Sequence, residues 1–152
     1  MPLVTVQVEV LTKATDETVE AFARLLPQLS RSAVPLDQAA LARIVESEAS
    51  TLLIARTDGV ITGTLTLVMF QIPTGLRAWI EDVVVDEAAG RQGIGSALTR
   101  EAIRIAREAG ARTVDLSSRP SRVAAGRLYE KLGFDLRDTR MYRYPLLGPA
   151  DS

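Results

Sequence analysis

Residues 83–98 read VVVDEAAGRQGIGSAL, an apolar strand pattern that leads through a glycine-rich turn into a helical pattern. The helical spacing continues to Ala109, and Gly110 is placed to end the helix. The first amides of a helix have no acceptor within it, and the helix dipole favours negative charge at that end. Glycines also let a ligand approach the backbone closely. The stretch therefore predicts a turn that can hold a phosphate or pyrophosphate group.

Glycine spacing alone leaves the ligand of this turn open. A Walker loop needs Lys and then Ser or Thr after its last glycine, whereas Gly95 is followed by Ser96 and Ala97. A dinucleotide fingerprint needs a third glycine where this chain has Leu98. Two alternatives therefore remain: a turn whose glycines serve only to pack the helix on the strand, and another kind of nucleotide-binding α/β domain.

The rest of the chain alternates between strand and helix patterns. Period-two or β-branched apolar runs predict seven strands, over residues 3–11, 51–57, 60–70, 76–85, 113–117, 134–136 and 139–146. Spacing near 3.6 predicts four helices, with Thr15, Asp37 and Ser121 as caps and Pro27 ending or kinking the first. This order predicts an α/β (α+β) fold, a mixed sheet with helices on its faces. We expect one domain over residues 1–147 and a frayed tail over residues 148–152.

Composition excludes several kinds of chemistry. The 152 residues include no Cys and no His, so disulfides, thiolate nucleophiles, histidine-ligated metals and Ser-His-Asp triads are impossible. We expect no metal site, and a general base must come from the 19 Asp and Glu residues, a terminus or water. The net charge of −1 does not favour binding to nucleic acid. No apolar run in the sequence is long enough to span a membrane. Without a signal peptide at the start, the expected location is the cytoplasm.

Two motifs carry a resemblance to a known family. Residues 90–98, GRQGIGSAL, resemble the coenzyme A pyrophosphate loop of the GNAT (Gcn5-related N-acetyltransferase) family, Gln/Arg-x-x-Gly-x-Gly/Ala. Residues 125–134, AGRLYEKLGF, are similar to its second hallmark, Ala-x-x-Leu-Tyr-x-Lys-x-Gly-Phe. Residues 79–85, WIEDVVV, stand where the family has its fourth strand. The element order agrees over essentially the whole chain, which implies a mostly antiparallel sheet of about seven strands flanked by about four helices.

The resemblance implies acetyl-coenzyme A (acetyl-CoA) as cosubstrate. Its pyrophosphate would lie on the turn, and its pantetheine arm would pair with the strand before it. The implied cofactor-binding residues are Val83, Val84, Val85, Arg91, Gln92, Gly93, Ile94, Gly95, Ser96 and Arg122. Two positions depart from the family pattern: Gly90 stands where Gln or Arg is usual, and Arg122 stands where Asn is frequent.

Glu81 is the candidate general base, because family members often carry a carboxylate on this strand. It shares strand parity with Val83 and Val85, so an unbulged strand points these three side chains to one face. Asp82, the alternative base, points to the opposite face unless a bulge intervenes. An ordinary solvated side chain is the other interpretation of Glu81.

Tyr129 is the candidate acid for the leaving coenzyme A thiolate, as the matching tyrosine is in many relatives. Its ordinary pKa near 10 is close to that of a thiol, so proton transfer between them is feasible. A core tyrosine beside Leu128 and Leu132 is the alternative interpretation. By family analogy, Phe22, the two N-terminal helices and the loop over residues 71–75 border the acceptor site.

The resemblance thus implies an N-acetyltransferase that moves an acetyl group directly from acetyl-CoA to an amine of a small molecule or peptide. Without Cys, a thioester-linked acyl-enzyme is not available. The alternative is a non-catalytic acyl-CoA-binding sensor or partner module, which would need neither Glu81 nor Tyr129. Homodimerisation is a further possibility that the family suggests.

Overall fold

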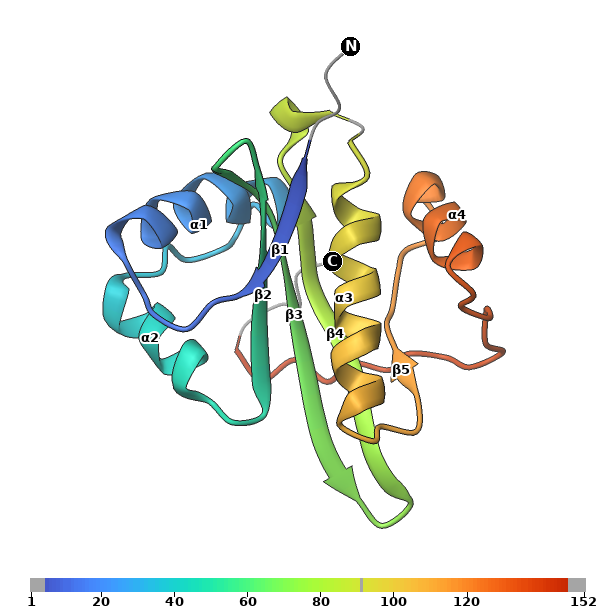
Figure 1. The fold of residues 1–152 in the computed structure, drawn as a ribbon. Coiled ribbons are helices and arrows are strands. Elements are labelled where there is room, and N and C mark those ends of the chain that lie inside the picture. Colours follow the sequence, from blue (N-terminus) through green and yellow to red (C-terminus); the bar gives the residue numbers. More distant parts are fainter. Residues whose placement is uncertain (1–4, 91, 148–152) are drawn as a thin grey trace. The chain divides into compact units, whose positions relative to one another are not determined.

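The computed structural model describes residues 5–90 and 92–147, and its backbone forms two compact units over residues 1–117 and 118–152. Within these residues, ten elements follow one another, and Figure 1 shows how they are arranged. The first unit holds β1 (Val6–Val10), α1 (Asp16–Leu29), α2 (Gln38–Glu46), β2 (Ser50–Thr57), β3 (Val60–Ile72), β4 (Gly75–Val85), a 3-10 turn (Glu87–Ala89), α3 (Ile94–Glu108) and β5 (Val114–Asp115). The second unit holds α4 (Val123–Lys131).

The sheet of the first unit has the order β1-β2-β3-β4-β5. Its first three pairings are antiparallel, and β4 pairs with β5 in parallel. Helices α1 and α2 cover one face and α3 covers the other (Figure 1). The predicted fold class, a mixed and mostly antiparallel sheet with four helices, is confirmed.

The described residues contain five strands, not the seven that the sequence predicts. The segments 134–136 and 139–146 have strand-like alternation, but they join no ladder of the sheet in the described structure. A strand requires a partner for its backbone hydrogen bonds, and side-chain periodicity does not supply one. Whether residues 1–147 act as one domain stays a prediction, and the predicted tail over residues 148–152 lies outside the described residues.

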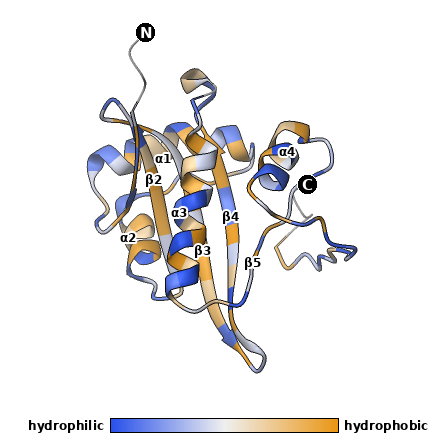
Figure 2. Cartoon of the chain, turned by 45° about the vertical axis from the view of Figure 1, so that its right-hand side comes forward, coloured by the Kyte–Doolittle hydropathy of each residue, from blue (hydrophilic) through white to orange (hydrophobic). Residues whose placement is uncertain are grey.

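One hydrophobic core of the first unit lies between α1, α2 and the sheet. Apolar side chains at helical spacing on α1 meet a row of apolar side chains from the strands; the buried cluster comprises Ala21, Phe22, Leu25, Leu41, Leu52, Ile54, Ile61 and Val84. The strands β2 and β3 are largely hydrophobic, whereas hydrophilic residues lie along α3 (Figure 2). No helix in the described ranges is long and apolar enough to cross a bilayer.

Local signals set most of the element boundaries. Thr15 caps α1 through the Thr18 amide at 3.2 Å, and Asp37 caps α2 through the Ala40 amide at 2.8 Å, as predicted. The turn between β2 and β3 has positive φ at both Asp58 and Gly59, the geometry of a tight hairpin. Two boundaries differ from prediction. α1 continues past Pro27 to Leu29, so Pro27 does not end this helix. The N-cap of α4 is Arg122, which makes no side-chain cap hydrogen bond, rather than the predicted Ser121.

Candidate functional site

The glycine turn ends at the start of α3 with its amides free. Gly93 caps the helix in the left-handed region (φ 75°), and Gly90 also has positive φ (67°). The first intrahelical bond at this end is donated by the Ala97 amide to the Gly93 carbonyl at 3.0 Å. The amides of Ile94, Gly95 and Ser96 therefore have no acceptor within the helix, and in the described residues no side chain caps them.

The surroundings of this turn leave room for an anion. A Cβ placed on Gly90 or Gly93 would meet nothing within 4 Å. Gln92 and Gly93 are exposed, and Gly95 and Ser96 are half-buried. The turn has the free amides and the open space that a phosphate group requires. Arg91, the remaining residue predicted to bind there, lies outside the described residues.

Close packing fixes the helix behind the turn. Gly63 of β3 lies under the start of α3, where an added Cβ would be 2.8 Å from Ile94 Cγ2 and 3.1 Å from Leu98 Cδ1. Only a glycine lets the strand and the helix approach this closely without a shift. The position of the free amides therefore depends on a residue about thirty positions earlier in the chain.

A polar clamp from α1 fixes the other end of the turn. Arg24 Nη1 donates to Asp86 Oδ2 at 2.6 Å, and Gln28 Nε2 donates to Asp86 Oδ1 at 3.2 Å. The same Asp86 oxygen accepts from the Ala88 amide at 3.1 Å, and Gln28 Oε1 accepts from the Glu87 amide at 2.9 Å. The hydrogen bond from Ala88, aided by Gln28 and Arg24, holds the pKa of Asp86 below its ordinary value although burial opposes this.

The strand β4 carries a bulge next to the predicted pantetheine site. Val84 pairs with Thr64 of β3 and Glu81 pairs with Thr66, so Asp82 and Val83 together lie opposite one residue. Asp82 has positive φ (51°) there. On the other edge of β4, the parallel ladder to β5 involves Ala78 and Trp79 alone in the described residues. The backbone of residues 83–85 thus faces no ladder partner from β5.

The bulge changes which side chains share a face. Glu81 pairs with Thr66, and both Thr66 and Asp82 line a cavity on the α1 and α2 side of the sheet. The arrangement expected for an unbulged strand, with Glu81 on the face of Val83 and Val85 and Asp82 opposite, therefore does not apply, because the bulge intervenes. Glu81 is exposed and accepts a hydrogen bond from Trp79 Nε1 at 2.5 Å.

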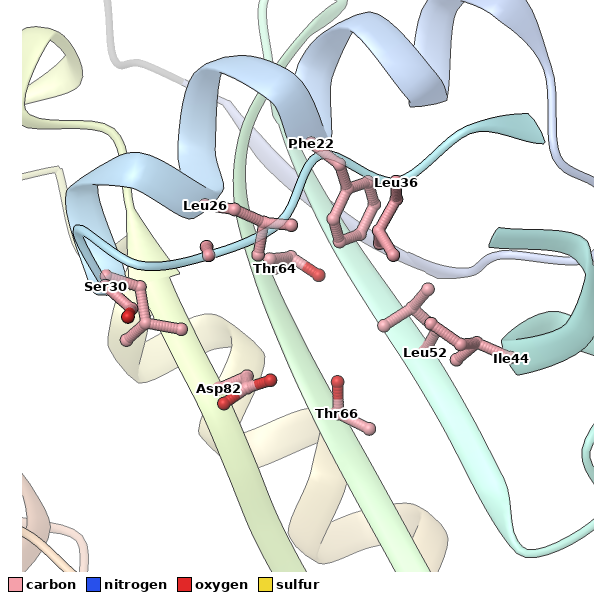
Figure 3. Close-up of a pocket in the computed structure, with 11 residues that line it drawn as sticks. Phe22, Leu26, Ser30, Leu36, Ile44, Leu52, Thr64, Thr66 and Asp82 are labelled. Atoms are coloured by element: carbon pink, nitrogen blue, oxygen red, sulfur yellow. The ribbon is translucent and has the colours of Figure 1, made fainter. Parts of the chain in front are cut away.

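The cavity has a volume of about 240 Å³ (Figure 3). Its walls come from α1, the connection to α2, α2 itself and the three central strands; the lining residues are Phe22, Leu26, Leu29, Ser30, Ala33, Leu36, Ile44, Leu52, Thr64, Thr66 and Asp82. Phe22 and residues of both N-terminal helices line this cavity. That they border an acceptor site stays a prediction from family analogy. Residues 71–75, predicted to border the same site, are not among the lining residues.

Tyr129 and Arg122 lie in the second unit, on α4 and at its N-cap. Tyr129 is buried, and its ring meets the edge of Phe134 with the centroids 5.6 Å apart. Burial raises the pKa of its phenol above the ordinary value, while the positive charge of Arg122 acts in the opposite direction. The phenol is therefore protonated at neutral pH, which a proton donor requires. The catalytic role of Tyr129, like that of Glu81, stays a prediction.

Comparisons with known proteins bear on the family and the fold. The model of the acetyltransferase (GNAT) family matches residues 15–134. An acetyltransferase from Trypanosoma brucei superposes with a TM-score of 0.74 at 28% identity, over 93% of this chain and 100% of that one. No curated protein sequence matches the chain significantly.

Two further solved structures have lower identity, so their likeness concerns the fold alone. An aminoglycoside acetyltransferase from an uncultured soil metagenomic sample has a TM-score of 0.80 at 20% identity, over 93% of this chain and 96% of that one. A ribosomal-protein-alanine N-acetyltransferase from Brucella melitensis biovar Abortus 2308 has a TM-score of 0.75 at 22% identity, over 93% of this chain and 99% of that one.

Proposed function

Since the chain belongs to the acetyltransferase (GNAT) family, we propose that it transfers an acetyl group from acetyl-CoA directly to a primary amine. The observation that carries this proposal is the free edge of β4 at residues 83–85. This edge follows Asp82 of the cavity and leads to the glycine turn. One continuous stretch of chain, from Asp82 to the glycine turn, thus joins a residue that lines a cavity for an acceptor to main-chain groups that can bind a cosubstrate.

Acetyl-CoA would bind mainly through main-chain groups. The amides of Ile94, Gly95 and Ser96, with those of Gln92 and Gly93, would hold the pyrophosphate at the helix dipole. The pantetheine arm would pair with Val83, Val84 and Val85 as an added strand. Backbone recognition is compatible with plain valines at these positions. Arg91 and Arg122 are further proposed contacts, supplying positive charge.

The chemical step moves two protons and exchanges one bond. The neutral amine nitrogen attacks the acetyl carbonyl carbon, a C–N bond forms, and the C–S bond breaks to release the thiolate. Glu81 takes the amine proton, directly or through water, and its orientation is fixed by the Trp79 hydrogen bond. The phenol of Tyr129 gives a proton to the thiolate. Without Cys in the chain, no acyl-enzyme thioester precedes this step.

The test is a pair of conservative variants, Glu81→Gln and Tyr129→Phe. With acetyl-CoA and a panel of primary amines, we expect each variant to lower kcat by roughly 10²–10⁴-fold. Acetyl-CoA binding, measured by calorimetry, should be unchanged in both. Unchanged turnover in both variants would contradict the proposed roles. Tight binding of acetyl-CoA with no acetylated amine from the wild-type chain would favour the alternative, a non-catalytic acyl-CoA-binding module.

A further inference from the structure

The cavity on the α1 and α2 side of the sheet is lined mainly by apolar side chains. Of its 11 lining residues, seven are hydrocarbon, three carry hydroxyl groups, and Asp82 alone carries a charge. In Figure 3, Asp82 and Thr66 lie on neighbouring strands, apart from the group of Phe22, Leu36 and Ile44. A ligand that fills this cavity therefore meets one carboxylate and a hydrocarbon wall.

Hydrogen bonds already made by other polar residues of the lining leave Asp82 as the principal recognition group. Thr64 is 1% exposed, and its hydroxyl already donates to the Leu53 carbonyl at 2.8 Å. Ser30 lies next to Ser32, with their hydroxyl oxygens 3.3 Å apart. Within residues 5–90 and 92–117, no arginine or lysine forms an ion pair with Asp82. Its charge is therefore available to a cationic ligand.

We propose that the acceptor is a small primary monoamine with an apolar body, whose ammonium group binds Asp82 and then gives one proton to solvent water, which leaves the neutral amine that reacts. This inference rests on the proposed function and specifies its substrate class. The apolar body would lie against Phe22, Leu36 and Ile44, where each hydrocarbon group gains by leaving water. Thr66 is placed to accept a further hydrogen bond from the ammonium group.

A polycationic acceptor does not fit this wall. A second ammonium group would lose its hydration against hydrocarbon side chains and find no second carboxylate in the cavity. The cavity is also small: at about 240 Å³ it lies below the roughly 300–1,000 Å³ typical of sites for drug-sized ligands. Both observations favour a compact acceptor with a single charge over an aminated sugar.

The first test compares matched amines with the wild-type protein. Hexylamine and 1,6-diaminohexane have the same chain length and differ by one ammonium group; kanamycin and a short peptide with a free N-terminus complete the set. We expect kcat/KM for hexylamine to exceed that for the diamine by at least about tenfold, since the second charge is buried without a partner. Preference for the diamine or kanamycin, or acetylation of the peptide alone, would overturn the proposal.

Two variants test the recognition itself. Asp82→Asn keeps a residue that tolerates positive φ, and we expect it to raise KM for hexylamine at least about tenfold while leaving acetyl-CoA affinity within about twofold. Leu36→Glu adds a second carboxylate at a half-buried wall position, so the diamine should gain relative to hexylamine. An unchanged KM in Asp82→Asn, or an unchanged ratio in a folded Leu36→Glu, would contradict the proposal.

Direct binding of hexylamine, measured by calorimetry without acetyl-CoA, separates this inference from the proposed function. Binding to the wild type that is lost in Asp82→Asn supports the assignment of the cavity, even if no acetyl group is transferred. Binding of acetyl-CoA without binding or acetylation of hexylamine would overturn the substrate class alone. Thermal unfolding of each variant checks that it folds.

Discussion

The glycine turn before α3 offers a ligand main-chain amides, whereas the cavity beside α1 and α2 offers it side chains. The turn is complete within a few consecutive residues, from Gly90 to Ser96. The cavity assembles side chains from Phe22 to Asp82, contributed by two helices, their connection and three strands. Recognition by the backbone thus depends on local conformation, while recognition by side chains depends on how distant segments pack. The predictions below probe each part of this difference.

The largest effect is expected from a negative charge inside the turn. Ser96→Asp places a carboxylate in the first turn of α3, where the helix dipole favours it. The same charge repels a pyrophosphate by about 4 kcal/mol at 4 Å for an effective dielectric constant of 20. We expect the affinity for acetyl-CoA, measured by calorimetry, to fall by about 100-fold or more.

Folding stability distinguishes repulsion from misfolding in this variant. Ser96→Asp should unfold at the same urea concentration as the wild type or at a higher one, because the new charge complements the dipole. Ser96→Asn, of similar shape without the charge, should retain most of the affinity. Unchanged affinity in Ser96→Asp would show that the turn is not the anion site.

A second substitution tests how far the turn depends on distant packing. Gly63→Ala brings a methyl group to within 2.8 Å of Ile94 Cγ2, so the strand or the helix must shift. We expect a loss of about 1–3 kcal/mol in the free energy of unfolding, measured in urea, and weaker acetyl-CoA binding. Gly126→Ala is the matched control, because its Cβ meets nothing within 4 Å and α4 is helical there. It should be neutral or stabilising; equal losses in both would refute the packing argument.

The clamp between α1 and the turn makes stability depend on pH. Asp86→Asn should lower the free energy of unfolding by about 1–2 kcal/mol at pH 7, since the ionic partner of Arg24 is lost. The pKa of Asp86 is lowered in the folded state, so its stabilisation is present above the unfolded value of 3.8 and is lost as pH falls through the lower folded value. Urea unfolding at several pH values should show that the free energies of unfolding of the wild type and Asp86→Asn become equal only when the pH is below the folded pKa of Asp86. Convergence near neutral pH would contradict the assignment.

The smallest effect concerns the buried tyrosine of α4. Burial raises the pKa of Tyr129 above 10.0, so this phenol should ionise later than an ordinary tyrosine as pH rises. The unfolded chain then releases this proton first, and the stabilisation is lost as pH rises through the folded pKa. Ultraviolet titration of the wild type and Tyr129→Phe should differ by one component with a midpoint above pH 10. A midpoint below 10 would contradict a protonated, buried donor.

Features encoded by consecutive residues were predictable, and features of assembly were not. The glycine turn, the Asp58-Gly59 hairpin and the cap at Asp37 follow from residues a few positions apart. The bulge at Asp82 could not be predicted from the sequence, because the order of acidic and apolar residues in β4 is compatible with a regular strand as well as with a bulged one. The cavity was indicated by family analogy at Phe22, but its lining and its single charge required the packed structure. Alternation over residues 139–146 predicted a strand, yet the described structure gives it no ladder partner.

The most direct test is the thermal unfolding of the wild-type protein with acetyl-CoA, run beside ATP and NAD at equal concentration. At 100 times its dissociation constant, a ligand stabilises the folded state by about 2.7 kcal/mol. For a chain of this size, each kcal/mol raises Tm by roughly 2–4 °C, so acetyl-CoA should raise it by about 5–10 °C. ATP and NAD should raise it less, because they lack the pantetheine arm that pairs with β4. No shift with saturating acetyl-CoA, or an equal shift with NAD, would contradict the central claim.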